Sequence, residues 1–206
     1  MERSSGRKKS VSEKLHLAQQ FSNARGAVQY AYNLLRCYAQ THPDKPVVVV
    51  FDIDDTLLSE TRNQKKYFKL PQIVWLLQQV NKMGGQVHLI TARNDDPETF
   101  RYTEEQLKLL NLHMGPQRDY LSLHLTPRHL RGSMRDVSRG KRNLRKKIAK
   151  AAGNKVTLSV GDQWTDHLRV ASNKEIDRLD DKFSASFSVV RVDDDTTVWG
   201  LKLPYL

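Results

Sequence analysis

Residues 47–58 read VVVVFDIDDTLL, five apolar residues followed by a group of acidic ones. The apolar run is rich in β-branched valine and is typical of a strand that is buried on both faces of a sheet. Asp52, Asp54 and Asp55 follow it closely. Carboxylates at the end of a buried strand lower stability unless something offsets their charge. The group therefore predicts either a bound divalent cation such as Mg²⁺, or a turn in which the acidic residues cap the next segment.

The rest of the chain alternates between strand and helix patterns. Apolar runs predict further strands at residues 86–90, 120–125, 155–160 and 187–192, and a short edge element at 198–203. Apolar residues at helical spacing predict helices over residues 11–40, 71–83, 97–110, 141–152 and 163–173. Strands that alternate with helices indicate an α/β fold with a mostly parallel sheet. In such folds, ligands bind at the carboxyl ends of the strands.

The 206 residues are enough for one domain with a sizeable core. We expect a basic flexible tail at residues 1–10, a helical segment at 11–46 and an α/β domain at 47–206. No run of 18 apolar residues is present, which argues against a membrane span. The basic N-terminus lacks the apolar segment of a secretory signal, and the single cysteine, Cys37, fits a reducing compartment. We therefore expect a cytoplasmic location, with the nucleus as the alternative.

The formal net charge of +11 is concentrated in two places. Residues 1–10 carry a net charge of +3 and residues 128–150 carry +9, so the rest of the chain is close to neutral. A local excess of Lys and Arg indicates an anionic partner more strongly than a diffuse excess does. Segment 128–150 therefore predicts a polyanion or nucleic acid as partner, and a solvated helix face is the alternative. No aromatic residues interleave with these bases, so we expect contacts with phosphates rather than recognition of bases.

Two other predicted strands also end in oxygen-bearing side chains. Thr91 follows the strand at 86–90, and its hydroxyl can hydrogen-bond a phosphate oxygen. Asp162 and Asp166 follow the strand at 155–160 and would share one face of a helix that began there. Taken singly, Thr91 fits a loop cap better than a phosphate contact, and Asp162 also fits a helix cap. Together with the acidic group after the first strand, they predict a cation site that faces a phosphate site.

In this arrangement the chain resembles the haloacid dehalogenase (HAD) superfamily of phosphohydrolases. The first motif of that superfamily is a strand ending in Asp-x-Asp-x-Thr, the second a Ser or Thr after a strand, the third a Lys, and the fourth an acidic pair after a strand. The matching positions for the first, second and fourth motifs are Asp52, Asp54, Thr56, Thr91, Asp162 and Asp166. Within the superfamily, the chain looks like the acid phosphatases that include plant vegetative storage proteins and bacterial class B and class C enzymes. The stretches ITAR at 90–93, with 104–106 downstream, and LKLPYL at 201–206 strengthen this likeness.

The resemblance implies a role for each motif residue. Asp52 would attack phosphorus and form an aspartyl phosphate, while Asp54 would protonate the leaving oxygen and then activate water. Mg²⁺ would be held by Asp52, by the backbone carbonyl of Asp54 and by Asp162, with Asp166 as a further ligand or a support. Thr91 and a lysine would hold the phosphoryl oxygens.

The lysine of the third motif stays open between two positions. Lys141 lies 21 residues before Asp162 and has Arg145 four positions after it, as in the plant-like members. Lys147 lies 15 residues before Asp162, which suits the spacing of the class B enzymes. We favour Lys141.

The resemblance also implies the architecture. We expect a three-layer, Rossmann-like fold with an N-terminal helix, because the segments around Thr91 are too short for a full cap domain. Such an open site would admit a phosphorylated small molecule or a macromolecule, and we expect Thr56, Ala92 and Arg93 to contact it. Segment 128–150 should lie near its rim.

The sequence therefore predicts a Mg²⁺-dependent phosphomonoester hydrolase. One alternative is a catalytically retired relative with a structural or binding role, although the intact motif carboxylates argue against it. The other alternative is a nucleic-acid-binding protein that uses residues 128–150.

Overall fold

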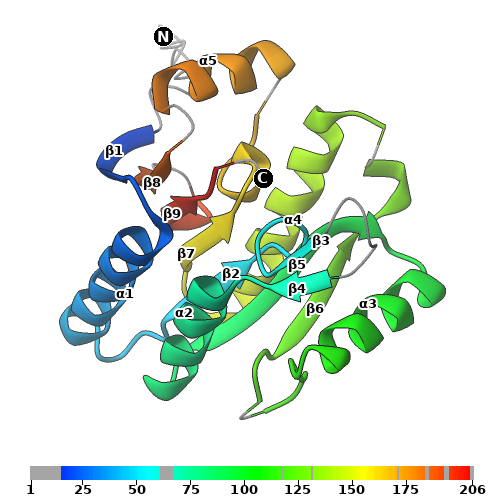
Figure 1. The fold of residues 1–206 in the computed structure, drawn as a ribbon, viewed down its shortest axis with the longest axis horizontal. Coiled ribbons are helices and arrows are strands. Elements are labelled where there is room, and N and C mark those ends of the chain that lie inside the picture. The colour runs from blue at the N-terminus through cyan, green and yellow to red at the C-terminus, as the bar shows by residue number, and fades with distance from the viewer. Residues whose placement is uncertain are drawn as a thin grey trace, which may run out of the picture.

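The structure is a computed structural model that describes residues 15–60, 67–116, 118–130, 132–170, 172–183, 186–192 and 195–204. Within these residues, seven strands form one sheet in the order β1-β8-β9-β7-β2-β5-β6 (Figure 1). Those strands are β1 (Leu15–Phe21), β2 (Val48–Phe51), β5 (Gln86–Asn94), β6 (Ser122–Thr126), β7 (Val156–Gly161), β8 (Phe187–Val192) and β9 (Thr197–Lys202). The helices are α1 (Ala24–Thr41), α2 (Pro71–Lys82), α3 (Pro97–Leu109), α4 (Met134–Ala152) and α5 (Asn173–Phe183).

The acidic stretch follows the middle of a parallel sheet. β2 pairs in parallel with β5 on one side and with β7 on the other, and β6 and β9 extend the parallel part. β8 runs antiparallel to both of its neighbours, β1 and β9. The expected α/β architecture with a mostly parallel sheet is therefore confirmed. Because β2, β5 and β7 are adjacent and parallel, the residues that follow them meet at one edge of the sheet.

Helices cover both faces of this sheet. Alternate residues of β2 point to opposite sides, so Val49 and Phe51 join the core under α1 and α2, whereas Val48 and Val50 pack with Ile148 of α4. α5 packs on the α4 side, where its buried residues contact β8. The molecule thus has three layers, as expected, with the acidic stretch leaving the central layer.

The predicted helix over residues 11–40 is wrong in its first half. Residues 15–21 form β1, which pairs with β8 from Leu15↔Val192 to Phe21↔Phe187. α1 begins only at Ala24, where the Asn23 side chain caps the helix by accepting a hydrogen bond from the Gly26 N–H at 2.9 Å. The strand depends on a partner about 170 positions away in the sequence, which a local pattern does not show. Residues 1–10 lie outside the described part of the chain.

Further elements differ from expectation, and α4 begins at Met134 rather than at the predicted residue 141. Residues 163–173 do not form one helix: a short 3-10 helix covers Trp164–Asp166, and α5 begins only at Asn173. The predicted edge element is β9, which lies inside the sheet between β8 and β7. A small hairpin of β3 (Leu58–Glu60) and β4 (Tyr67–Lys69) follows the acidic stretch and was not predicted. A second 3-10 helix, Arg128–Leu130, leads from β6 toward α4.

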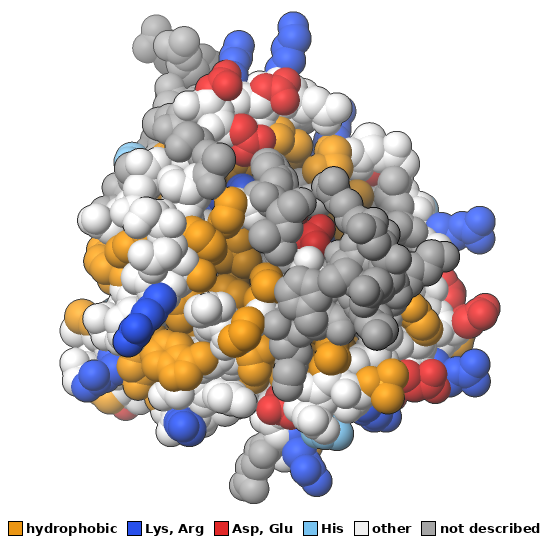
Figure 2. All heavy atoms as spheres, viewed as in Figure 1, with side chains coloured by type: hydrophobic (Ala, Val, Ile, Leu, Met, Phe, Trp, Pro, Cys, Tyr) orange, Lys and Arg blue, Asp and Glu red, His pale blue; other side chains and the backbone are white. Residues whose placement is uncertain are grey.

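Figure 2 shows the face that carries α1 and α2. Apolar side chains gather over these helices, and most of the visible Lys and Arg side chains stand singly near the outline. No helix in the described part of the chain is long and apolar enough to cross a membrane.

Candidate active site

The loop after β2 is a tight turn that places Asp52 and Asp54. The Asp52 N–H donates to the Val160 carbonyl of β7 at 2.9 Å, which continues the sheet by one residue. The N–H groups of Leu57 and Leu58 both donate to the Ile53 carbonyl at 2.9 Å, and Asp55 takes the left-handed conformation with φ 53°. The turn thus reverses the chain within a few residues of the strand end.

Three buried carboxylates meet at this edge of the sheet. Oxygen atoms of Asp52, Asp162 and Asp166 lie within 4.8 Å of one another. Asp52 follows β2 and the other two follow β7, so the pairing of these strands creates the group. Asp166 reaches the group from the short 3-10 helix, where its carboxylate also accepts from the Gln163 N–H at 3.0 Å. We call Asp52, Asp162 and Asp166 the acidic cluster.

Gly161 makes the close approach of Asp166 possible. A Cβ at position 161 would lie 2.2 Å from Asp166 Oδ2, closer than van der Waals contact allows. The last residue of β7 must therefore lack a side chain for Asp166 to fold back onto the strand end.

Lys141 supplies the positive charge within the cluster. Its Nζ donates to Asp52 Oδ1 at 2.7 Å and also to Asp166 Oδ1, and its side chain is only 3% exposed. Lys147, the other position weighed for this role, is exposed. Arg145 is buried on the same face of α4 and donates from Nη1 to the carbonyls of Thr165 and Asp166 at 3.1 and 2.8 Å. α4 thus brings the Lys141 charge to the cluster and holds the loop that carries Asp166.

Burial and mutual repulsion dominate the electrostatics of the cluster. Burial raises the pKa of Asp52 well above its usual range, and the neighbouring carboxylates add to this effect while Lys141 opposes it. Burial, followed by repulsion from Asp166, raises the pKa of Asp162 to about 7, against the lowering effects of Lys141 and Lys202. Burial alone would lower the pKa of Lys141, but attraction to Asp166 and Asp52 outweighs it and raises that pKa.

Asp54 points to a second set of partners. Arg93 donates two hydrogen bonds to the Asp54 carboxylate, from Nη2 to Oδ1 at 2.6 Å and from Nε to Oδ2 at 3.1 Å. The Thr91 hydroxyl donates to Asp54 Oδ2 at 3.1 Å. The Asp54 side chain is 47% exposed, so it faces solvent while its position is held from β5.

Arg93 is itself oriented by α3. Its Nη1 donates to the Thr103 hydroxyl at 3.0 Å and to Gln106 Oε1 at 2.6 Å. Both partners are buried. We expected a substrate contact from Arg93, whereas sequence reasoning missed its ion pair with Asp54 and the role of Thr103. Of the partners of Arg93, the sequence indicated only Gln106, because Gln106 lies in the stretch 104–106 that resembles the acid phosphatases.

The other residues expected to contact substrate occupy different surroundings. Thr56 is fully buried in the turn, and its hydroxyl has no hydrogen-bond partner among the described residues. Ala92 is half-buried in β5 between Thr91 and Arg93. Their contact with substrate stays a prediction.

Lys202 is a neighbour of the cluster that sequence reasoning missed. It ends β9, next to the end of β7, and its Nζ donates to the Leu203 carbonyl at 2.7 Å and lies 5.5 Å from the centre of the Trp164 ring. Burial lowers its pKa, against the opposing effects of Asp180, Asp162 and Asp166. The order of the strands, which the sequence does not show, brings it there.

The acidic cluster fits a divalent cation. Its three carboxylates are the hard oxygen ligands that Mg²⁺ prefers. Lys141 bonds to two of them and offsets part of their charge, and a bound cation would further favour the ionised forms of Asp52 and Asp162, whose pKa values are raised by burial and then by repulsion from the other carboxylates. The Asp54 side chain, by contrast, is turned to Arg93, so of this residue only the backbone carbonyl is left as a ligand.

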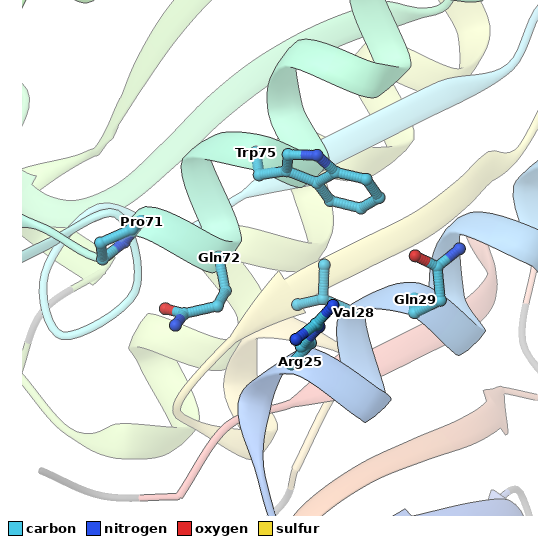
Figure 3. A pocket seen from close by; sticks show the side chains of 6 residues that line it. All are labelled: Arg25, Val28, Gln29, Pro71, Gln72 and Trp75. Atoms are coloured by element: carbon cyan, nitrogen blue, oxygen red, sulfur yellow. The ribbon is translucent and has the colours of Figure 1, made fainter.

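One cavity lies away from this cluster. It measures about 330 Å³ and opens between α1 and α2, with Trp75 above Val28 (Figure 3). Its lining residues are Arg25, Val28, Gln29, Pro71, Gln72 and Trp75. The space against Asp52, Lys141 and Asp166 is only about 10 Å³, which is room for about one water molecule. The chemistry of the site therefore comes from its charged groups and not from a large pocket.

Comparison with known proteins agrees with this geometry. A family model described as HAD superfamily, subfamily IIIB (acid phosphatase) matches residues 4–69 and 62–183, more than half of the chain. No curated protein is similar enough in sequence to count as a match.

Two of the solved structures that match this chain are phosphatases. The class C acid phosphatase from Bacillus anthracis superposes with a TM-score of 0.53 at 15% identity, over 77% of this chain and 72% of that chain. The cobalt-bound deoxy-D-mannose-octulosonate 8-phosphate phosphatase from Haemophilus influenzae gives a TM-score of 0.36 at 18% identity, over 60% of this chain and 62% of that chain. The second superposition is too poor to bear on the fold.

The family match extends over the segments that build the site. It spans Asp52, Thr91, Lys141 and the Asp162–Asp166 loop, which lie together at the carboxyl edge of the sheet. The chain belongs to the acid phosphatases of HAD superfamily subfamily IIIB and is a phosphatase.

Proposed function

We propose that the chain hydrolyses phosphomonoesters with Mg²⁺, through a phosphoryl group carried on Asp52. One observation supports this most directly: Asp52 Oδ1 lies 2.7 Å from Lys141 Nζ within a buried cluster of three carboxylates. A carboxylate held beside a fixed cation, at the end of the central strand, is positioned to attack an electrophile at the sheet edge.

In the first step, an Asp52 oxygen forms a bond to phosphorus and the ester P–O bond breaks. The leaving oxygen takes a proton from Asp54, which Arg93 and Thr91 hold from β5. In the second step, a water oxygen attacks phosphorus, Asp54 takes the proton of that water, and the bond between phosphorus and Asp52 breaks. Phosphate is released and both carboxylates return to their starting state.

Lys141 and Thr91 support both steps from opposite sides. Lys141 contacts Asp52 directly, so its charge offsets the negative charge that develops on the phosphoryl oxygens. The Thr91 hydroxyl donates to Asp54 Oδ2, and when substrate binds it would hold a phosphoryl oxygen next to Asp54. Both groups are buried, which holds them in place before substrate arrives.

Asp52, Asp162 and Asp166, with the backbone carbonyl of Asp54, would hold the Mg²⁺ ion. When bound, the ion supplies positive charge at the phosphoryl oxygens and orients them. The side chain of Asp166 also bonds to Lys141 and to the Gln163 N–H, so it supports the geometry as well as offering a ligand atom.

We also propose that the substrate is a phosphorylated molecule that contacts Thr56, Ala92 and Arg93. Between β2 and α2 the structure describes only the small β3–β4 hairpin, which agrees with an open site. The exposed bases of α4 give a separate reason to expect a polyanionic partner. A cytoplasmic location, with the nucleus as the alternative, stays a prediction.

The replacement Asp52→Asn tests the covalent step. We expect turnover of an aryl phosphate with Mg²⁺ to fall by several orders of magnitude while the protein stays folded, because the attacking oxygen is removed. Asp44→Asn, at an exposed carboxylate, is the matched control and should keep native turnover. Near-native turnover by Asp52→Asn would exclude the covalent mechanism.

A second experiment separates an enzyme from a retired relative. Wild-type protein is treated with a chelator and assayed on nucleotides, sugar phosphates, phosphopeptides and aryl phosphates, with and without added Mg²⁺. We expect activity that depends on Mg²⁺. Activity that survives exhaustive chelation would exclude the metal site, and no turnover of any substrate would favour a structural or binding role.

A further inference from the structure

The outer face of α4 carries a line of exposed bases. Arg135, Arg139, Lys146 and Lys150 are all exposed and are spaced four, seven and four residues apart. At 3.6 residues per turn this spacing puts them along one side of the helix, over a length of about 22 Å. We call these four residues the α4 stripe.

The packing of α4 fixes the direction in which the stripe points. The opposite side of the helix buries Val137, Ser138, Lys141, Arg145 and Ile148 against the sheet and the Asp166 loop. The Ser138 hydroxyl donates to the Leu168 carbonyl at 3.2 Å and accepts from the Val170 N–H at 2.7 Å. Because these contacts prevent α4 from turning about its axis, the stripe must face solvent.

Few acidic groups neutralise this surface. Arg139 pairs with Asp136 at 2.8 Å, and the neighbouring Arg142 pairs with Asp195 at 2.5 Å. Within the described residues, Arg135, Lys146 and Lys150 form no ion pair. The sequence of α4 contains eight bases and one acid, whereas α3 and α5 each contain one acid more than they contain bases.

We propose that the α4 stripe binds the phosphate backbone of a nucleic acid. A strand of a duplex has a phosphate about every 3.4 Å along the duplex axis but winds around that axis, so a straight line of about 22 Å can contact several of its phosphates. α4 contains no aromatic residue on which a base could stack, so binding involves phosphates and is independent of base sequence.

A nucleic acid fits this surface better than a membrane does. A helix that binds a lipid surface inserts its apolar face between the headgroups. In α4, Val137 and Ile148 are buried in the protein, and Leu144 packs against the same cluster as Ile148, so these side chains cannot insert. The stripe therefore offers charge without an apolar anchor.

The test compares two four-residue variants made in the full chain. One replaces the stripe with Gln (Arg135→Gln, Arg139→Gln, Lys146→Gln and Lys150→Gln). The matched control removes the same charge from exposed bases on other elements (Arg25→Gln, Lys45→Gln, Lys82→Gln and Lys174→Gln). Binding to a fluorescent 20-base-pair duplex is followed by anisotropy in a chelator, over a range of salt concentrations, so the result does not depend on phosphatase turnover.

We expect the stripe variant to bind the duplex at least about 10-fold more weakly at low salt. The slope of log affinity against log salt should fall by about 0.9 for each phosphate that the variant no longer neutralises. The control should stay within about 2-fold of wild type, and both variants should hydrolyse a small aryl phosphate at the wild-type rate if the proposed phosphatase activity holds. An equal loss of binding in both variants would show that net charge alone is responsible and would overturn the proposal. Absence of duplex binding by wild type, or tighter binding to anionic vesicles than to the duplex, would also overturn it.

Discussion

Replacing Asp162 with Asn should stabilise the metal-free protein at pH 8 and remove most of its response to Mg²⁺. Asp162 is buried beside Asp166, and its pKa is raised from 3.8 to about 7. At about 1.4 kcal/mol for each pH unit, this shift corresponds to an ionisation penalty of up to about 4 kcal/mol in the folded state. Asn has nearly the same shape and carries no charge, so it avoids the penalty.

The effect has a defined dependence on pH. The folded state holds the Asp162 proton more tightly than the unfolded state does, so the free energy of unfolding falls as pH rises from about 4 to about 7. Below that range Asp162 is protonated in both states and the penalty is absent. The Asn variant should therefore match wild type near pH 4 and exceed it most at pH 8.

Urea unfolding, with and without Mg²⁺, measures both effects. In chelator at pH 8 we expect Asp162→Asn to gain up to about 4 kcal/mol, which for a chain of this size raises the melting temperature by up to about 16 °C. Mg²⁺ at 100 times its dissociation constant should stabilise wild type by about 2.7 kcal/mol and the variant by much less. The free energies of unfolding of the two proteins should therefore converge, or their order should reverse, when Mg²⁺ is added.

Two results would refute this reasoning. If Asp162→Asn were less stable than wild type in chelator at pH 8, Asp162 would be stabilising the fold rather than straining it. If Mg²⁺ stabilised both proteins equally, Asp162 would not be a ligand. Asp44→Asn, at an exposed carboxylate, should change neither stability nor Mg²⁺ response.

Three further replacements test the contacts around the cluster. Lys141→Met leaves the buried carboxylates of Asp52 and Asp166 without their ammonium partner, and should lower the free energy of unfolding of the metal-free protein, measured in urea, by about 3 to 5 kcal/mol; an unchanged midpoint would contradict this pairing. Gly161→Ala places a Cβ 2.2 Å from Asp166 Oδ2, so it should lower the free energy of unfolding by about 1 to 3 kcal/mol and raise the Mg²⁺ concentration for half activity. Native values of both would show that the Asp166 loop relaxes freely. Arg93→Lys removes the bidentate hydrogen bonds to Asp54 and should lower kcat for an aryl phosphate by about 10- to 100-fold at a similar KM. A raised KM at constant kcat would instead show that Arg93 binds substrate.

The sequence predicted the parts of the fold whose signals are local. The apolar run before Asp52 marked a strand buried on both faces, and burial of β2 on both faces of a parallel sheet agrees with it. Pro97 at the start of a helical pattern located α3 to within one residue. Asp52, Asp162 and Asp166 were expected to share a site because residues after adjacent parallel strands meet at one edge.

The sequence failed where long-range pairing outweighs local spacing. Residues 15–21 have apolar positions that also fit a helix, but they pair with β8 as a strand. Asp162 and Asp166 were expected on one face of a helix, whereas a short 3-10 turn and the bare Cα of Gly161 bring them together. In both places the stabilising contact lies outside any window of sequence that a pattern covers.

The residue types of the site were readable from the sequence, because each motif stands directly after a strand. Which lysine reaches them was decided by tertiary structure: α4 packs with Lys141 toward Asp52 and leaves Lys147 exposed. The partner of Asp54 was likewise decided by the packing of α3 beside β5, which orients Arg93 through Thr103 and Gln106. Helix rotation and strand order set these contacts, and both result from burial of apolar surface across the whole domain, which no local segment specifies.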